Sequence, residues 1–156
     1  MSIQFQSKTL DTGMTIIAET DSHAHSAAAG FFVKAGARDE ASKIMGVSHF
    51  LEHMVFKGTD INQGFDRLGA SNNAYTSREM TCFYAQVIPE HISTATDLLS
   101  KMMRPALRDA DFDTEKQVIL EEIAMYQDNP FWVLYEEATA RHYGRHGLAH
   151  RVLGTK

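Results

Sequence analysis

The chain has 156 residues and a mass of 17.5 kDa, the size of one domain that can bury a core of its own. Hydrophobic residues make up 44% and charged residues 22%, an ordinary globular composition that argues against disorder. The net charge is −5 without a Lys/Arg run, which gives no support for nucleic-acid binding, and the longest apolar run, residues 27–33, is far shorter than the roughly 20 residues of a membrane span.

The first third of the chain is expected to form strands. Ile3–Leu10 alternates loosely and Met14–Glu19 is rich in β-formers, with the turn Asp11–Gly13 between them, which predicts a hairpin. Ser26–Ala35 is a continuous small and aromatic run and is expected to be a buried strand. No basic stretch followed by an apolar one is visible at the N-terminus, so no signal peptide is expected. The single cysteine, Cys82, is expected to be buried and fits a reducing compartment, so we expect a cytoplasmic location.

The remainder of the chain is expected to be mainly helical. Helices are predicted at about residues 46–56, 61–68, 89–103, 114–127 and 131–143, and extended segments at 74–76 and 81–88. Asp113 is the expected N-cap of the fourth helix, and Asn129-Pro130 separates it from the fifth. Because helices follow strands without a repeat or a linker, residues 1–156 are predicted to be a single α+β domain with a mostly antiparallel sheet and helices packed on one face.

The first predicted helix carries His49, Glu52 and His53 on one side. At about 100° per residue, the two histidines lie about 40° apart and Glu52 lies about 60° to the other side of His49. Two imidazoles at this spacing can bind one zinc ion, and the carboxylate between them can act as general base toward a zinc-bound water. Two histidines without a ligand role are the alternative. The intervening glutamate and the apolar residues around it favour the metal site, since this is the inverted zinc-protease pattern H-x-x-E-H.

The helix predicted at 114–127 offers a third ligand. Its buried stripe is predicted to consist of Val118, Ile119, Ile123 and Tyr126. Glu115 and Glu122 fall inside this stripe, whereas Glu121 points toward its rim. Because carboxylates in an apolar stripe are costly unless something compensates, we expect Glu122 to be the third ligand and Glu115 to orient a histidine or the water.

Four stretches carry a resemblance to a known family: HFLEHMVFKGT, FDRLGASNNAYTSREMTCFYAQV, DFDTEKQVILEEIAMYQDNP and HGLAHRVLGT. Together, in this order and from about Thr9 to the end, they resemble the pitrilysin, insulin-degrading enzyme and mitochondrial processing peptidase family of zinc metallopeptidases. The likeness is greatest to the bacterial members that resemble processing peptidases. The resemblance implies the fold of one metallohydrolase half, truncated in this chain.

The resemblance also implies roles for individual residues. It assigns one zinc ion per chain to His49, His53 and Glu122, with Glu52 as general base and Glu115 as a supporting catalytic residue. It further implies that Asn73-Ala74 lies on a sheet edge beside the scissile bond of an extended peptide, a mode in which the peptide adds a strand. For Asn73 the alternative is a plain turn residue.

Two departures from the family pattern qualify this expectation. The stretch between His53 and Glu122 is several residues shorter than the family norm, with the shortfall around Thr59–Ile61. Family enzymes also have two homologous halves, each longer than this chain. We therefore expect residues 1–156 to be most of one N-terminal half, its second half being absent from this chain and carried on the same or a separate polypeptide.

The expected function is that of a zinc-dependent metalloendopeptidase domain acting on a peptide or an unfolded protein. Zinc-activated water, with Glu52 as general base, would hydrolyse the peptide bond. Without its second half the fragment is expected to be weakly active or inactive. The alternative is a non-catalytic peptide-binding or scaffolding module of the same family, but such relatives typically lose the zinc residues, all of which this chain keeps. A purely structural zinc domain would leave Glu52 unexplained.

Overall fold

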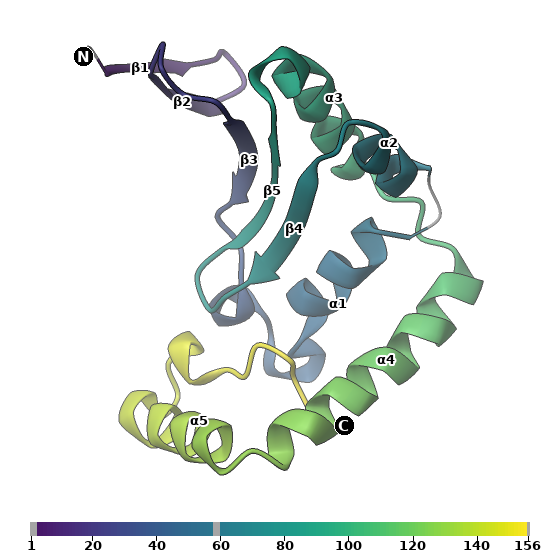
Figure 1. The fold of residues 1–156 in the computed structure, drawn as a ribbon. Coiled ribbons are helices and arrows are strands. Elements are labelled where there is room, and N and C mark those ends of the chain that lie inside the picture. Colours follow the sequence, from purple (N-terminus) through teal and green to yellow (C-terminus); the bar gives the residue numbers. More distant parts are fainter. Residues whose placement is uncertain (1–2, 58–59, 156) are drawn as a thin grey trace.

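The computed structural model describes residues 3–57 and 60–155 (Figure 1). Its strands are β1 (Gln4–Thr9), β2 (Thr15–Thr20), β3 (Ala27–Val33), β4 (Ser71–Thr76) and β5 (Thr81–Val87). Its helices are α1 (Val47–Val55), α2 (Ile61–Arg67), α3 (Ile92–Met102), α4 (Asp109–Gln127) and α5 (Pro130–Tyr143), joined by loops and short 3₁₀ turns. Every helix among these described residues is too short or too polar to cross a membrane.

All strand pairs are antiparallel, which confirms the predicted α+β class. β1 and β2 form a separate hairpin, and β3, β5 and β4 form a sheet in that order. On the central strand β5, Phe83, Ala85 and Val87 face the helices and are buried, whereas Tyr84 between them is 38% exposed. This alternation puts one face of the sheet against α1 and α3 and leaves the other open.

The hydrophobic core lies between that sheet face and three helices. It includes Val55 of α1, Phe65 of α2 and a stripe on α3 formed by Ala95, Leu99 and Met102. The stripe follows the i, i+4, i+7 spacing of an amphipathic helix, so local sequence periodicity and tertiary burial agree. The core therefore fixes α1 against β4 and β5. Helix α4 packs against α1 on this same side of the sheet (Figure 1).

The N-terminus of α1 is capped by a residue that precedes the helix by several positions. Gly46 precedes the helix with φ of 97°, a conformation that favours glycine, and it cannot cap with a side chain. Glu40 supplies the cap: its Oε2 accepts from the backbone N–H of Gly46 at 2.6 Å and its Oε1 from Ser48 N–H at 2.7 Å. Gly154 packs against the same corner, since a Cβ there would come within 2.3 Å of the Met45 carbonyl oxygen. These contacts fix the turn of helix that carries His49.

Three secondary-structure predictions differ from the structure. α4 begins at Asp109 rather than near Thr114, because Asp109 and Asp111 favour the positive end of the helix dipole; Asp113 is therefore inside the helix and is not its N-cap. β4 begins at Ser71 rather than at residue 74. β3 is not a buried strand: it lies at a sheet edge, and Phe32 on its open face is 70% exposed.

Other predictions hold, or lie partly outside the described residues. The N-terminal hairpin and the burial of Cys82 are confirmed. The helix predicted from residue 89 has a 3₁₀ first turn, Pro89–His91, before α3. The predicted shortfall around Thr59–Ile61 involves residue 59, which lies outside the described residues.

We predict that Glu40→Ala lowers the free energy of unfolding by about 2 kcal/mol, because two backbone N–H groups lose a charged acceptor. Urea denaturation followed by circular dichroism measures the change. As a control, Glu90→Ala at an exposed position should change stability by no more than about 0.5 kcal/mol. Equal losses in the two variants would show that Glu40 does not stabilise the helix start.

Candidate metal centre

Three side chains predicted as ligands converge in the structure. His49, His53 and Glu122 each offer a ligand atom, and these atoms lie within 4.8 Å of one another. The Nε2 atoms of His49 and His53 are each 3.6 Å from Glu122 Oε2. Atoms bound to zinc in a tetrahedron at about 2.0–2.1 Å lie roughly 3.3–3.4 Å apart, so the donor set has the size and chemistry that fit this ion.

The packing of α1 on α4 produces this arrangement. His49 and His53 are one turn apart on α1, with ring centroids 4.7 Å apart, and α4 crosses beside them (Figure 1). The side chain of His49 is 9% exposed, whereas those of His53 and Glu122 are 22% and 25% exposed. The cluster is therefore closed at His49 and open to solvent on the other side.

The surroundings of His49 favour its neutral form. Burial lowers the pKa of this imidazole and outweighs the opposing attraction of Glu122. A neutral imidazole carries a hydrogen on one nitrogen and a lone pair on the other. His49 is thus in the protonation state that a metal ligand requires.

His53 and Glu122 hold each other in charged form. The Glu122 carboxylate raises the pKa of His53; burial opposes this, and Glu115 adds to it. In turn His53 lowers the pKa of Glu122, against the effect of burial. In the metal-free cluster His53 therefore binds a proton more tightly than a free imidazole does, and metal binding would displace that proton.

Glu115 lies seven residues, or two helical turns, before Glu122 on the same face of α4. It is buried, with only 2% of its surface exposed. Its Oε2 lies 3.0 Å from His53 Nδ1, and its Oε1 lies 2.7 Å from Lys57 Nζ. Burial raises the pKa of Glu115, but Lys57 and His53 outweigh it and the net shift is downward. When His53 is neutral, as a metal ligand must be, an ionised Glu115 accepts the hydrogen on Nδ1 and leaves the lone pair on Nε2, the nitrogen that faces Glu122.

Glu52 lies on the side of α1 that faces the sheet edge. The hydroxyl of Thr76, the last residue of β4, donates to Glu52 Oε2 at 2.5 Å. One carboxylate oxygen of the predicted general base is thus held by the strand that is predicted to receive substrate.

Asn73 and Ala74 lie in β4, an edge strand of the three-stranded sheet. The turn alternative for Asn73 is therefore wrong. Ala74 pairs with Phe83 of β5, and the Asn73 side-chain oxygen accepts from Ala74 N–H at 2.8 Å. The opposite edge of β4 has no strand partner among the described residues, so it can accept an added strand.

Sequence reasoning missed two polar contacts and one exposed residue. Lys57 follows His53 by four residues, the same spacing that singled out the histidine pair, and this was the available signal. For Thr76 no local signal existed, because its partner is 24 residues away. Val118, predicted in the buried stripe of α4, is 43% exposed because it lies at the edge of a stripe formed by Glu115, Ile119 and Ile123.

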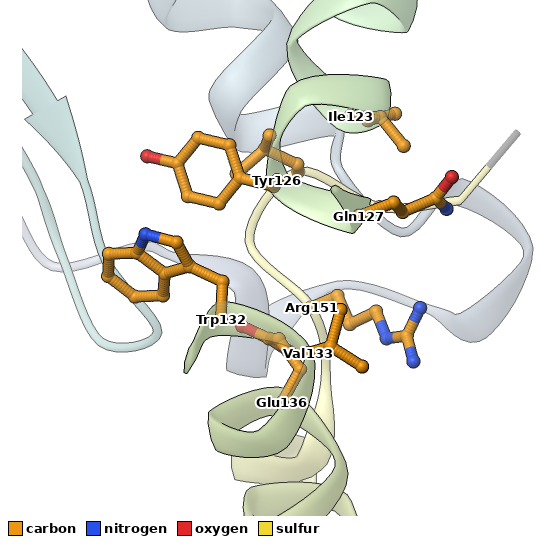
Figure 2. A pocket seen from close by; sticks show the side chains of 9 residues that line it. Ile123, Tyr126, Gln127, Trp132, Val133, Glu136 and Arg151 are labelled. Carbon is orange, nitrogen blue, oxygen red and sulfur yellow. The ribbon is translucent and has the colours of Figure 1, made fainter. Parts of the chain in front are cut away.

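A cavity of about 130 Å³ lies at the C-terminal end of α4 (Figure 2). Tyr126 and Trp132 lie on one side of it, and Gln127 and Arg151 on the other. None of the seven predicted site residues lines it. It is therefore separate from the convergent ligand set.

Comparison with known proteins gives consistent matches. Residues 15–156 match the family described as Insulinase (Peptidase family M16). A Bacillus subtilis protein named "Uncharacterized zinc protease YmxG" is 40% identical, in a match that covers 95% of this chain and 38% of that protein.

Two solved structures share the fold. A protease from Helicobacter pylori has a TM-score of 0.91 at 24% identity, and the match covers 99% of this chain and 39% of the Helicobacter pylori chain. An M16-like peptidase from Alicyclobacillus acidocaldarius has a TM-score of 0.89 at 26% identity, with the same coverage of 99% and 39%. The chain thus spans less than two fifths of the length of these relatives.

We predict about one zinc ion per molecule of the purified chain, and its loss in Glu122→Ala, because that change removes one of three convergent donors. Glu121→Ala, on the exposed side of the same helix turn, should keep the metal. Atomic absorption after dialysis against limiting zinc measures the zinc content of the wild type and of both variants. Equal losses from the two variants would exclude Glu122 as the specific third ligand.

We also predict that zinc affinity falls as the pH decreases. In the metal-free protein the pKa of His53 is raised above 6.5, so below that raised value zinc must displace a bound proton. The affinity should then decrease about tenfold per pH unit and level off above it. Competition with a chelator between about pH 6 and pH 8 measures this. A pH-independent affinity would contradict a ligand role for His53.

Proposed function

This chain belongs to the insulinase family, peptidase family M16, and on that premise we propose that residues 1–156 form a zinc-dependent metalloendopeptidase domain. The observation that carries the proposal is the convergence of His49, His53 and Glu122. Beside them Glu52 is held for general-base chemistry. The name of the Bacillus subtilis relative, a zinc protease, supports the same class of reaction.

His49, His53 and Glu122 would hold one zinc ion. When bound, zinc supplies Lewis-acid chemistry: it polarises a peptide carbonyl and makes water acidic enough to attack at neutral pH. Glu52 accepts the proton of the attacking water and can pass it to the departing amine nitrogen. Thr76 orients Glu52 by donating to Oε2, which leaves Oε1 as the proton acceptor. Glu115 keeps the hydrogen of His53 on Nδ1.

The substrate in this proposal is an extended peptide or a segment of an unfolded protein. It would add as a strand to the free edge of β4, with backbone hydrogen bonds that do not depend on its sequence. Asn73 and Ala74 would then lie beside it, three and two residues, respectively, before the Thr76 that contacts Glu52. Strand addition would bring one peptide bond next to the base and the metal ligands.

We infer that the chain is most of one N-terminal peptidase half. The relatives are more than twice as long, which supports a second homologous half on the same or a separate polypeptide. Further transition-state contacts would come from that half, so the 156-residue chain alone should bind metal but hydrolyse peptides weakly or not at all. A cytoplasmic location stays a prediction from the sequence.

The alternative is a non-catalytic peptide-binding or scaffolding module. The free edge of β4 would serve that role equally well. A scaffold has no need of a base held beside three convergent donors, so the presence of Glu52 and its Thr76 contact favours the peptidase.

We predict that Glu52→Gln in the complete protein retains zinc and lowers kcat/KM for peptide cleavage by about 10³-fold, because the amide cannot accept the proton. Zinc content and cleavage of a fluorogenic peptide library are measured together, with Glu121→Gln as the matched control.

If Glu52→Gln cleaved peptides as fast as the wild type, Glu52 would not be the general base. A complete wild-type protein that binds zinc and peptide but never cleaves would favour the scaffolding module instead.

A further inference from the structure

Lys57 forms an ion pair with Glu115, the carboxylate that contacts His53 of the proposed metal centre. It follows the C-terminal end of α1, where its backbone N–H donates to the Met54 carbonyl at 3.1 Å. From there the ammonium group reaches α4, with Nζ 2.7 Å from Glu115 Oε1. The Lys57 side chain is 40% exposed and that of Glu115 only 3%, so the contact leads from solvent to a buried carboxylate.

The two oxygens of Glu115 have separate partners. Oε2 contacts His53 Nδ1 at 3.0 Å, and Oε1 contacts Lys57. A buried carboxylate is destabilising unless a positive group compensates its charge. A metal-bound His53 is a neutral donor and cannot supply that charge, whereas Lys57 can.

Asp111, a further acid on α4, does not require Lys57 as a counter-charge. Asp111, one turn before Glu115, has its own cation in Arg108, whose Nε lies 2.6 Å from Asp111 Oδ2. Within residues 3–57 and 60–155, Lys57 is the one Lys or Arg in ion-pair contact with Glu115. The pairing is therefore specific in the described part of the chain.

The contacts of Glu115 also join the two helices that carry the ligands. His53 and Lys57 both come from the end of α1, and both reach one carboxylate of α4. Glu122 lies seven residues further along the same face of α4. A shift of Glu115 relative to α1 would therefore also move Glu122 relative to the histidines.

The geometry points to Lys57 as a positioning residue: by holding Glu115 against His53, it preorganises the donor set His49, His53 and Glu122 and tightens zinc binding. This inference rests on the proposed function, since zinc is the ion that the donor set is proposed to hold. In this proposal Lys57 contacts neither the metal nor the substrate and acts only through Glu115.

The test is the zinc dissociation constant of the 156-residue chain, measured by chelator competition. Lys57→Met keeps the aliphatic stem and removes the charge, and the dissociation constant should rise by up to about 10-fold, the lower end of the effect of losing a direct partner of a metal ligand such as Glu115. Lys57→Arg restores the charge and should stay within about threefold of the wild type.

Lys101→Met is the matched control. Lys101 Nζ is also 2.7 Å from a carboxylate oxygen, that of Asp97, but both side chains are more than half exposed on α3. Loss of that pair should leave the zinc dissociation constant unchanged. Urea denaturation of each metal-free variant separates a general loss of folding from a change at the metal centre.

A double-mutant cycle tests whether Lys57 acts through Glu115. Lys57→Met should weaken zinc binding in the wild-type background and have almost no further effect in Glu115→Gln, because the partner is already lost. An equal effect in both backgrounds would overturn the inference.

The remaining outcomes are distinguishable. A wild-type chain that folds but does not bind zinc overturns the proposed function and this inference with it. Tight wild-type binding with an unchanged affinity in Lys57→Met overturns only the role of Lys57, and so does a Lys57→Arg variant as weak as Lys57→Met.

Discussion

The candidate site depends on the packing of α1 against α4. Neither helix alone can bind a metal with three protein ligands, because α1 offers two imidazoles and α4 offers carboxylates on a stripe that also contains Ile119 and Ile123. Packing the two helices together buries the apolar part of that stripe and forces Glu115 and Glu122 against His53 and His49. The hydrophobic contact and the polar cluster thus stabilise the same helix pair and depend on each other.

Charge compensation explains why the polar part of this interface is tolerated. Glu115 lies between His53 and Lys57, and Glu122 lies between the two imidazole Nε2 atoms. The buried Glu115 and the half-buried Glu122 therefore each have imidazole or ammonium neighbours, which is the condition for a stable carboxylate away from water. The opposite pKa shifts of His49 and His53 follow from the same geometry: burial dominates at His49, and the carboxylates dominate at His53.

The sheet provides the second element of the proposed chemistry. The buried face of β5 holds α1 in place, and the neighbouring strand β4 ends at Thr76, which contacts Glu52. A peptide added to the free edge of β4 would thus be aligned by the same strand that holds the base. At the other end of α1, Glu40 and the tail around Gly154 fix the turn that carries His49. Four separate segments of the chain therefore determine the position of one short helix.

Local sequence determined the elements and most of the candidate residues. Spacing on α1 singled out His49, Glu52 and His53, and helical periodicity separated Glu115 and Glu122 from Glu121, because neighbours along a helix project at fixed angles. The α+β class and the hairpin also followed from local patterns. Tertiary structure decided what periodicity cannot describe: the early start of α4 at Asp109, the open face of β3, and the contacts made by Lys57, Thr76 and Glu40. Lys57 and Thr76 reach partners on other elements and Glu40 caps a helix six residues ahead of it, so their roles depend on how the chain folds back on itself and not on the residues immediately around them.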